Sequence, residues 1–239
     1  MKNFDFYEFN GLLLPGILAL FGVSLLSTGF LSVVGGSSLT VGDLGLFVVL
    51  AYIVGHLVQA MSTVLEPFLW NRGGGMPTAR IQKEKPRWLT PEQYAQLDSH
   101  LKKKLNLSPN GNLQDVASNE WFGITRQVYA AVAAQGRAAR VDTFNGTYGL
   151  LRGLLTVLLS LIILTSTVAY KVPLGNVQDQ YLVALLALVF CTYLIFNRMK
   201  RFGGDYAQEL FVQFLQLPLS PATQATPSTT SGTILPQTP

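Results

Sequence analysis

The sequence predicts an all-α, polytopic membrane protein in which four transmembrane helices form two hairpins around a helical insert. Three observations lead to this fold class. The chain of 239 residues is 49% hydrophobic and only 13% charged, too apolar for an ordinary soluble domain. Its basic residues are spread unevenly between the segments that join the apolar regions. Finally, it contains four long apolar stretches, at residues 11–34, 44–70, 148–170 and 181–196.

The lengths of these stretches support spanning helices in three cases directly. A helix rises 1.5 Å per residue, so each of the first three can cross about 30 Å of hydrocarbon. The fourth, with roughly 16 residues, is short for a span. We still expect it to cross, because otherwise Arg198, Lys200 and Arg201 would lie on the outer side, against the usual charge bias.

The same charge bias predicts the orientation. The short connections 35–43 and 171–180 contain one basic residue, Lys171, whereas most of the 17 Lys and Arg lie in residues 71–147 or after residue 197. Basic segments stay on the cytoplasmic side. We therefore expect a cell-membrane protein with both termini and residues 71–147 in the cytoplasm, near anionic lipid headgroups.

The N-terminal hairpin is expected to cover residues 1–70. Its first apolar stretch is too long for a cleaved signal peptide, and Asp5 and Glu8 precede it where such peptides are basic. Pro15 should loosen this helix near its cytoplasmic end, because proline has no N–H. A neighbouring helix would then have to supply a donor to the freed carbonyl.

The insert, residues 71–147, is predicted to be basic and mostly helical. Thr90 to Gln93 has the pattern of a capping box, with Pro91 at the first helical position. Apolar residues then recur at helical spacing as far as Leu105. A second helix is expected from near Ser118 through Val132.

The rest of the chain divides into three segments. Residues 148–197 form the C-terminal hairpin. Residues 198–217 place Leu210, Phe211 and Phe214 on one face, which predicts an amphipathic helix at the membrane interface. Residues 218–239 are uncharged and rich in Pro, Thr and Ser, so they are expected to be a disordered tail.

A polar stripe marks the second apolar stretch. Its five members recur every three or four residues, within an arc of about 80° on a helix, so we expect them to face the bundle or a wet cavity. Two interpretations stay open: interhelical hydrogen bonds worth about 0.6 kcal/mol each, or a pathway in which His56 and Glu66 exchange protons. The stripe is Tyr52, His56, Gln59, Thr63 and Glu66.

Arg152 is the expected partner of Glu66. Both lie about one turn inside the cytoplasmic boundary, at the end of the second stretch and the start of the third. An ion pair there would couple the two hairpins and the insert between them. The alternative is that Arg152 extends to the headgroups.

Arg137 and Arg140, three residues apart, share a helix face suited to phosphate groups. We expect them to dock an anionic partner, either lipid headgroups, a phosphate-bearing ligand or a cytoplasmic protein. The plainer interpretation is a solvated cluster that only sets the topology.

No motif predicts a reaction. Cys191 is the sole cysteine, and the three glycines at 73–75 lack the Lys-Ser/Thr ending of a phosphate-binding loop. We therefore expect no catalytic residue, no metal and no cofactor. Only Arg87 and Trp88 resemble a nucleic-acid contact, so a nucleic-acid partner is not expected.

These observations favour a non-enzymatic, homo-oligomeric inner-membrane protein. Its basic insert would dock or sense an anionic partner and be coupled to the helix bundle, as in a pore-forming or membrane-disrupting effector. The alternative is an oligomeric transporter or proton-coupled channel that uses the polar stripe.

Overall fold

The computed structural model describes residues 9–26, 41–71, 75–83, 88–105, 113–171 and 176–218. In this part of the chain all regular structure is helical, which confirms the predicted all-α class. Residues 27–40, which include the end of the first predicted span and most of the connection at 35–43, lie outside it, as do residues 219–239 of the predicted tail. The elements, in order, are η1 (Phe9–Leu13), α2 (Leu14–Leu26), α4 (Val41–Asn71), α5 (Pro77–Lys83), α6 (Pro91–Leu105), η2 (Leu113–Asp115), α7 (Ser118–Ala134), α8 (Ala139–Lys171) and α9 (Asn176–Leu215).

Three helical segments are long and apolar enough to cross a membrane: Gly42–Asn71, Ala139–Lys171 and Asp179–Leu215. The apolar helix Gly11–Leu26 is shorter in the described part of the chain. The stretch 181–196, which is short on its own, therefore lies within a much longer helix. The residues on both sides of this stretch extend the helix well beyond the roughly 16 residues expected from sequence.

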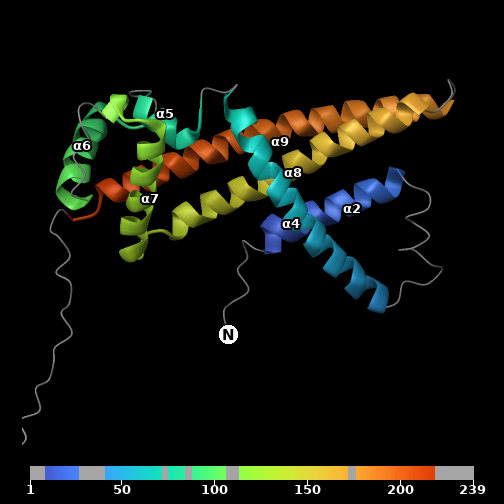
Figure 1. Ribbon diagram of the computed structural model, residues 1–239, viewed down its shortest axis with the longest axis horizontal. Coiled ribbons are helices and arrows are strands. Elements are labelled where there is room, and N and C mark those ends of the chain that lie inside the picture. The colour runs from blue at the N-terminus through green and yellow to red at the C-terminus, as the bar shows by residue number, and fades with distance from the viewer. Residues whose placement is uncertain are drawn as a thin grey trace, which may run out of the picture.

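The long helices α8 and α9 lie side by side and run in opposite directions along the longest axis of the molecule (Figure 1). They contain 33 and 40 residues. At 1.5 Å per residue these helices are about 50 and 60 Å long, so each exceeds the thickness of a hydrocarbon layer.

Helices α2 and α4 cross each other beside this pair (Figure 1), at a contact that only glycine allows. A Cβ added to Gly16 would lie 1.8 Å from the carbonyl oxygen of Ala51, and one added to Gly55 would lie 2.1 Å from that of Leu12. Gly153 of α8 faces the same crossing, with the Pro15 ring 3.0 Å from its Cβ position. Small residues thus let three backbones meet, as is common between membrane helices.

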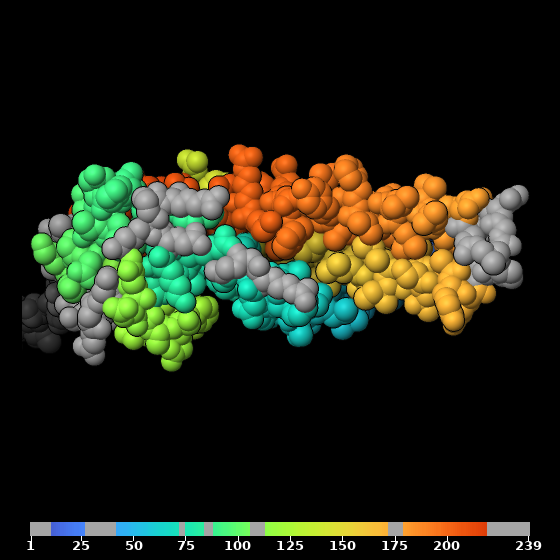
Figure 2. All heavy atoms as spheres, turned by 90° about the horizontal axis from the view of Figure 1, so that it is seen from above, coloured from blue at the N-terminus to red at the C-terminus, as the bar shows by residue number. Residues whose placement is uncertain are grey.

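The insert helices α5, α6 and α7 gather at one end of the molecule, against the C-terminal half of α9 (Figure 2). Their apolar faces share one core with α9 and with the first turn of α8. Trp121 of α7 stacks on Phe211 of α9 with ring centroids 5.6 Å apart. The largest fully buried members are Trp121, Phe211, Phe214, Ile81, Leu97, Leu101, Leu113 and Leu210.

This core changes the interpretation of residues 198–217. They do not form a separate interfacial helix, because α9 runs through Asn176–Leu215 without a break. Leu210, Phe211 and Phe214 are fully buried. The apolar face expected against the membrane surface is covered instead by the apolar faces of the insert.

Local sequence patterns explain where the insert helices begin and end. The Thr90 amide donates to Oε1 of Gln93 at 2.9 Å, and the Gln93 amide donates to Oγ1 of Thr90 at 3.2 Å, so the capping box is confirmed. Helix α7 ends before Gly136, whose φ of +69° favours glycine. Helix α8 then begins at Ala139, nine residues before the predicted boundary at 148.

Candidate functional site

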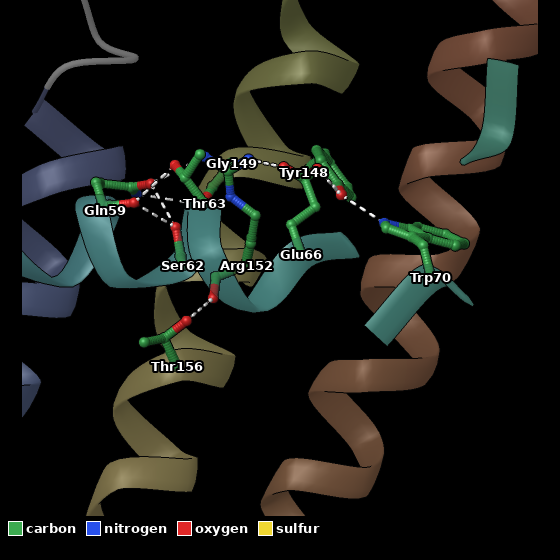
Figure 3. A network of polar contacts seen from close by, with 9 residues as sticks. All are labelled: Gln59, Ser62, Thr63, Glu66, Trp70, Tyr148, Gly149, Arg152 and Thr156. Atoms are coloured by element: carbon green, nitrogen blue, oxygen red, sulfur yellow. Dashed lines mark hydrogen bonds and ion pairs between the residues drawn. The ribbon is translucent and has the colours of Figure 1, made fainter. Parts of the chain in front are cut away.

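A chain of polar contacts joins the last turns of α4 to the N-terminal third of α8 (Figure 3). Trp70 Nε1 donates to the Tyr148 hydroxyl at 2.7 Å, and that hydroxyl donates to Oε1 of Glu66 at 2.5 Å. Arg152 Nη1 donates to the other carboxylate oxygen, Oε2, at 2.6 Å. Both oxygens of Glu66 therefore have a donor, in a site where the Glu66 side chain is only 12% exposed and the Arg152 side chain 20%.

Gln59 extends the chain of contacts from α8 to η1. Its Oε1 accepts from Arg152 Nη2 at 3.3 Å, and its Nε2 donates to the Gly11 carbonyl at 2.6 Å and to the Gly149 carbonyl at 3.3 Å. Gly11 is the residue whose carbonyl Pro15, four positions later, cannot serve because it lacks an N–H. The donor expected from a neighbouring helix is thus the Gln59 side chain.

We call these residues the polar network: Gln59, Glu66, Trp70, Tyr148 and Arg152. Charge-assisted hydrogen bonds between poorly exposed groups are stronger than neutral ones. Arg152 Nε, in contrast, is buried and has no hydrogen-bond partner among the described residues. The network therefore fixes the packing of α4 on α8, but it leaves one donor of Arg152 unsatisfied.

The structure divides the predicted polar stripe. Gln59 and Glu66 join the polar network, whereas Tyr52, His56 and Thr63 are exposed on the outer side of α4. Thr63 Oγ1 donates to the Gln59 carbonyl of its own helix at 3.0 Å. Of the five residues expected to face the bundle or a wet cavity, only Gln59 and Glu66 bond another helix within the described part of the chain.

The rotation of α4 explains this division. Its buried line runs through Ala51, Gly55, Val58 and Ser62, and at 100° per residue this line lies roughly 90° from the middle of the stripe. Gln59 and Glu66 occupy the stripe's nearer edge. The close contacts at Ala51 and Gly55 set the rotation, so the small residues of α4 and not its polar ones face α2.

Sequence reasoning missed several members of the site. Tyr148 precedes Arg152 by four residues and Trp70 follows Glu66 by four, so each shares a helix face with the ion pair. That spacing is a signal that could have identified them. Ser62, which donates to the Gln59 carbonyl at 2.8 Å and to its Oε1 at 3.2 Å, carries no comparable signal.

Trp70 links the polar network to the insert and to α9. Its side chain is buried, and the Arg80 guanidinium of α5 lies 5.8 Å from its ring centroid. A Cβ at Gly203 of α9 would lie 3.2 Å from the Trp70 ring. Four helices, α4, α5, α8 and α9, therefore meet around one indole.

Arg137 and Arg140 have different surroundings. Arg137 is exposed in the turn before α8. The pKa of Lys104 is lowered first by the burial of Lys104 itself and second by the positive charge of Arg137. Arg140 lies 3.6 Å from the Glu209 carboxylate, which partly balances its charge, although its side chain is 70% exposed. Arg137 and Lys104 thus bring two positive charges close together.

Within the described ranges, no three His, Cys, Asp or Glu residues are close enough to hold a metal ion. Cys191 is exposed on α9. Comparison of the chain with protein-family models, curated proteins and solved structures finds no match.

Proposed function

We propose that this chain is a non-enzymatic, multi-pass inner-membrane protein. Its cytoplasmic insert docks an anionic group, and the docked state is passed to the helix bundle, where it controls a pore. One observation carries the proposal. The polar network ends on Trp70, the residue at which the insert, both hairpins and the ion pair meet.

The coupling follows from how the insert is held. It continues directly from α4 and into α8, and its apolar core includes Leu210, Phe211 and Phe214 of α9. A displacement of the insert therefore changes α9 packing and the environment of Trp70 together. Because Trp70 donates to Tyr148, which in turn donates to Glu66, the ion pair responds to the same displacement.

The anion site is assigned to the cluster around Lys104, Arg137 and Arg140. Burial, and after it the positive charge of Arg137, lowers the pKa of Lys104, so the two cations lie close enough to repel each other. A phosphate group would offset this repulsion and accept several hydrogen bonds at once. Glu209 would weaken the contribution of Arg140, so Arg137 should matter more.

The alternative of a transporter along the polar stripe carries an added requirement. Tyr52, His56 and Thr63 are exposed on the side of α4 that does not pack against the other described helices. A pathway lined by all five stripe residues would therefore have to be enclosed between copies. The polar network favours coupling over conduction, because Gln59 and Glu66 already have bonded partners.

The test uses purified protein in vesicles of neutral lipid alone or of neutral lipid mixed with an anionic phospholipid, with ion and dye flux recorded. We expect flux that depends on the anionic lipid, and an Arg137→Ala/Arg140→Ala variant that loses this dependence. The matched control is Lys103→Ala/Arg126→Ala, which removes the same charge from two exposed insert residues. It should behave as wild type.

Glu66→Gln separates docking from coupling. This variant should bind anionic vesicles normally but lose the dependent flux, because the insert stays intact while the network is broken. Flux that is equal in both vesicle types, and unchanged by the arginine substitutions, would contradict the proposal.

A further inference from the structure

The outer side of α4 carries polar groups at a depth where lipid offers no partner. Tyr52 is 44% exposed and His56 is also exposed. Their rings meet edge to face, with centroids 4.7 Å apart. Within the described part of the chain, neither the Tyr52 hydroxyl nor a His56 ring nitrogen has a hydrogen bond. His56 is the sixteenth of the 31 residues of α4, so it lies at the middle of the span.

Lipid is a poor neighbour for this surface. Leaving a hydroxyl or amide-like group unbonded in hydrocarbon costs roughly 4–8 kcal/mol on transfer from water. Polar residues at membrane depth normally face protein or water for this reason. The exposed aliphatic residues elsewhere on α4, such as Leu57 and Val64, face lipid without that cost.

The glycines of the spanning helices support the same conclusion. Gly16, Gly55 and Gly153 each have atoms of another helix within 3.0 Å of the Cβ position. Gly45 lies on the same side of α4 as Tyr52 and His56, yet none of the described residues has an atom within 4 Å of its Cβ position. The close approach that the other three glycines provide within the chain is unused at Gly45.

The spacing on this side matches a pair of parallel helices. Gly45, Val49, Tyr52 and His56 are separated by four, three and four residues, the alternation of four and three that keeps one seam of a helix facing a partner. Two copies inserted in the same direction have parallel α4 helices. Residues at equal depth, and residues one helical turn apart, then meet across a two-fold axis.

We propose that the outer seam of α4, formed by Gly45, Val49, Tyr52 and His56, is the surface on which a second copy of this chain packs. The Tyr52 hydroxyl of each copy bonds the His56 imidazole of the other. The pairing is self-complementary, because a hydroxyl and a neutral imidazole each both donate and accept. This requires that α4 spans the membrane, but not that the insert binds an anion.

Cysteine cross-linking in membranes tests the proposal. In a Cys191→Ser background, single cysteines replace Gly45, Val49 or Tyr52 and are oxidised in vesicles that contain no anionic lipid. Disulfide-linked dimers should form several-fold more readily there than with Leu57→Cys or Val64→Cys. These controls are exposed residues on a different side of α4. Equal or absent dimer at the seam positions would overturn the proposal and leave lipid or another protein as the occupant.

A second measurement separates the interface from a general loss of folding. His56→Leu removes both symmetric hydrogen bonds, each worth about threefold in association, so dimerisation should weaken by about tenfold. Leu57→Ala should leave it unchanged. A His56→Leu protein with wild-type helicity and wild-type dimer affinity would refute the pairing, whatever the flux assays show.

Discussion

The Glu66–Arg152 ion pair offers a quantitative test of the polar network. Glu66→Gln keeps an oxygen acceptor at the site but leaves the Arg152 guanidinium without an anion. Arg152→Met does the reverse and leaves the Glu66 carboxylate with only Tyr148 as a donor. In both variants a poorly exposed charge loses its partner, whereas the double variant contains neither charge.

The magnitude follows from the exposure of the two side chains. Breaking a buried ion pair by removing one partner costs about 3–5 kcal/mol. Glu66 and Arg152 keep 12% and 20% of their side-chain exposure, so each single substitution should fall at the lower end, about 3 kcal/mol. The double variant should lose about 3–4 kcal/mol in place of about 6, a coupling energy of about 2–3 kcal/mol.

The assay is reversible unfolding in mixed micelles, followed by tryptophan fluorescence, because Trp70 lies in the network. Val64→Ala on the exposed side of α4 serves as the control and should add to Arg152→Met with no coupling. Coupling below about 0.5 kcal/mol between Glu66 and Arg152 would refute the reasoning, since it would mean that the charges are solvated independently.

Three further outcomes are expected. Gly204→Ala should detach the insert from α9, because the new Cβ would lie 2.2 Å from the Trp88 ring, and the insert should then be cleaved faster by protease. The control is Gly123→Ala, where no atom of the described residues lies within 4 Å, and it should stabilise α7 by up to about 1 kcal/mol. Thr90→Ala should cost about 1 kcal/mol and increase amide exchange in the first turn of α6, and unchanged exchange would argue against the capping box. A hydrogen bond to Asp142, with burial, raises the pKa of Tyr129 to about 12. The unfolded chain therefore loses this proton first, and the stability of the fold should decrease as the pH rises from about 10 to about 12. Because the side chain is partly exposed, the decrease should be under about 1 kcal/mol, and Tyr129→Phe should abolish it.

The sequence located the part of the site whose contacts follow from the depth of each residue along its apolar stretch. Glu66 and Arg152 lie at matching positions near the ends of two apolar stretches, and the structure brings them to 2.6 Å. The partners Tyr148 and Trp70 follow from i,i+4 spacing once the pair is known. The role of Gln59 at the Gly11 carbonyl could not be found this way, because it depends on where η1 packs.

Patterns within the sequence were enough to predict the all-α class, the apolar stretches long enough to span, and the start of α6. These are local properties, set by hydropathy summed over some 20 residues and by side-chain caps within one turn. The tertiary structure alone decided which side of α4 faces inward and what covers the apolar face of residues 198–217. Helix rotation depends on backbone contacts between distant segments, here Gly16 with Ala51 and Gly55 with Leu12. The cover over α9 depends on an insert that folds back from far along the chain, and no local pattern in α9 contains that information.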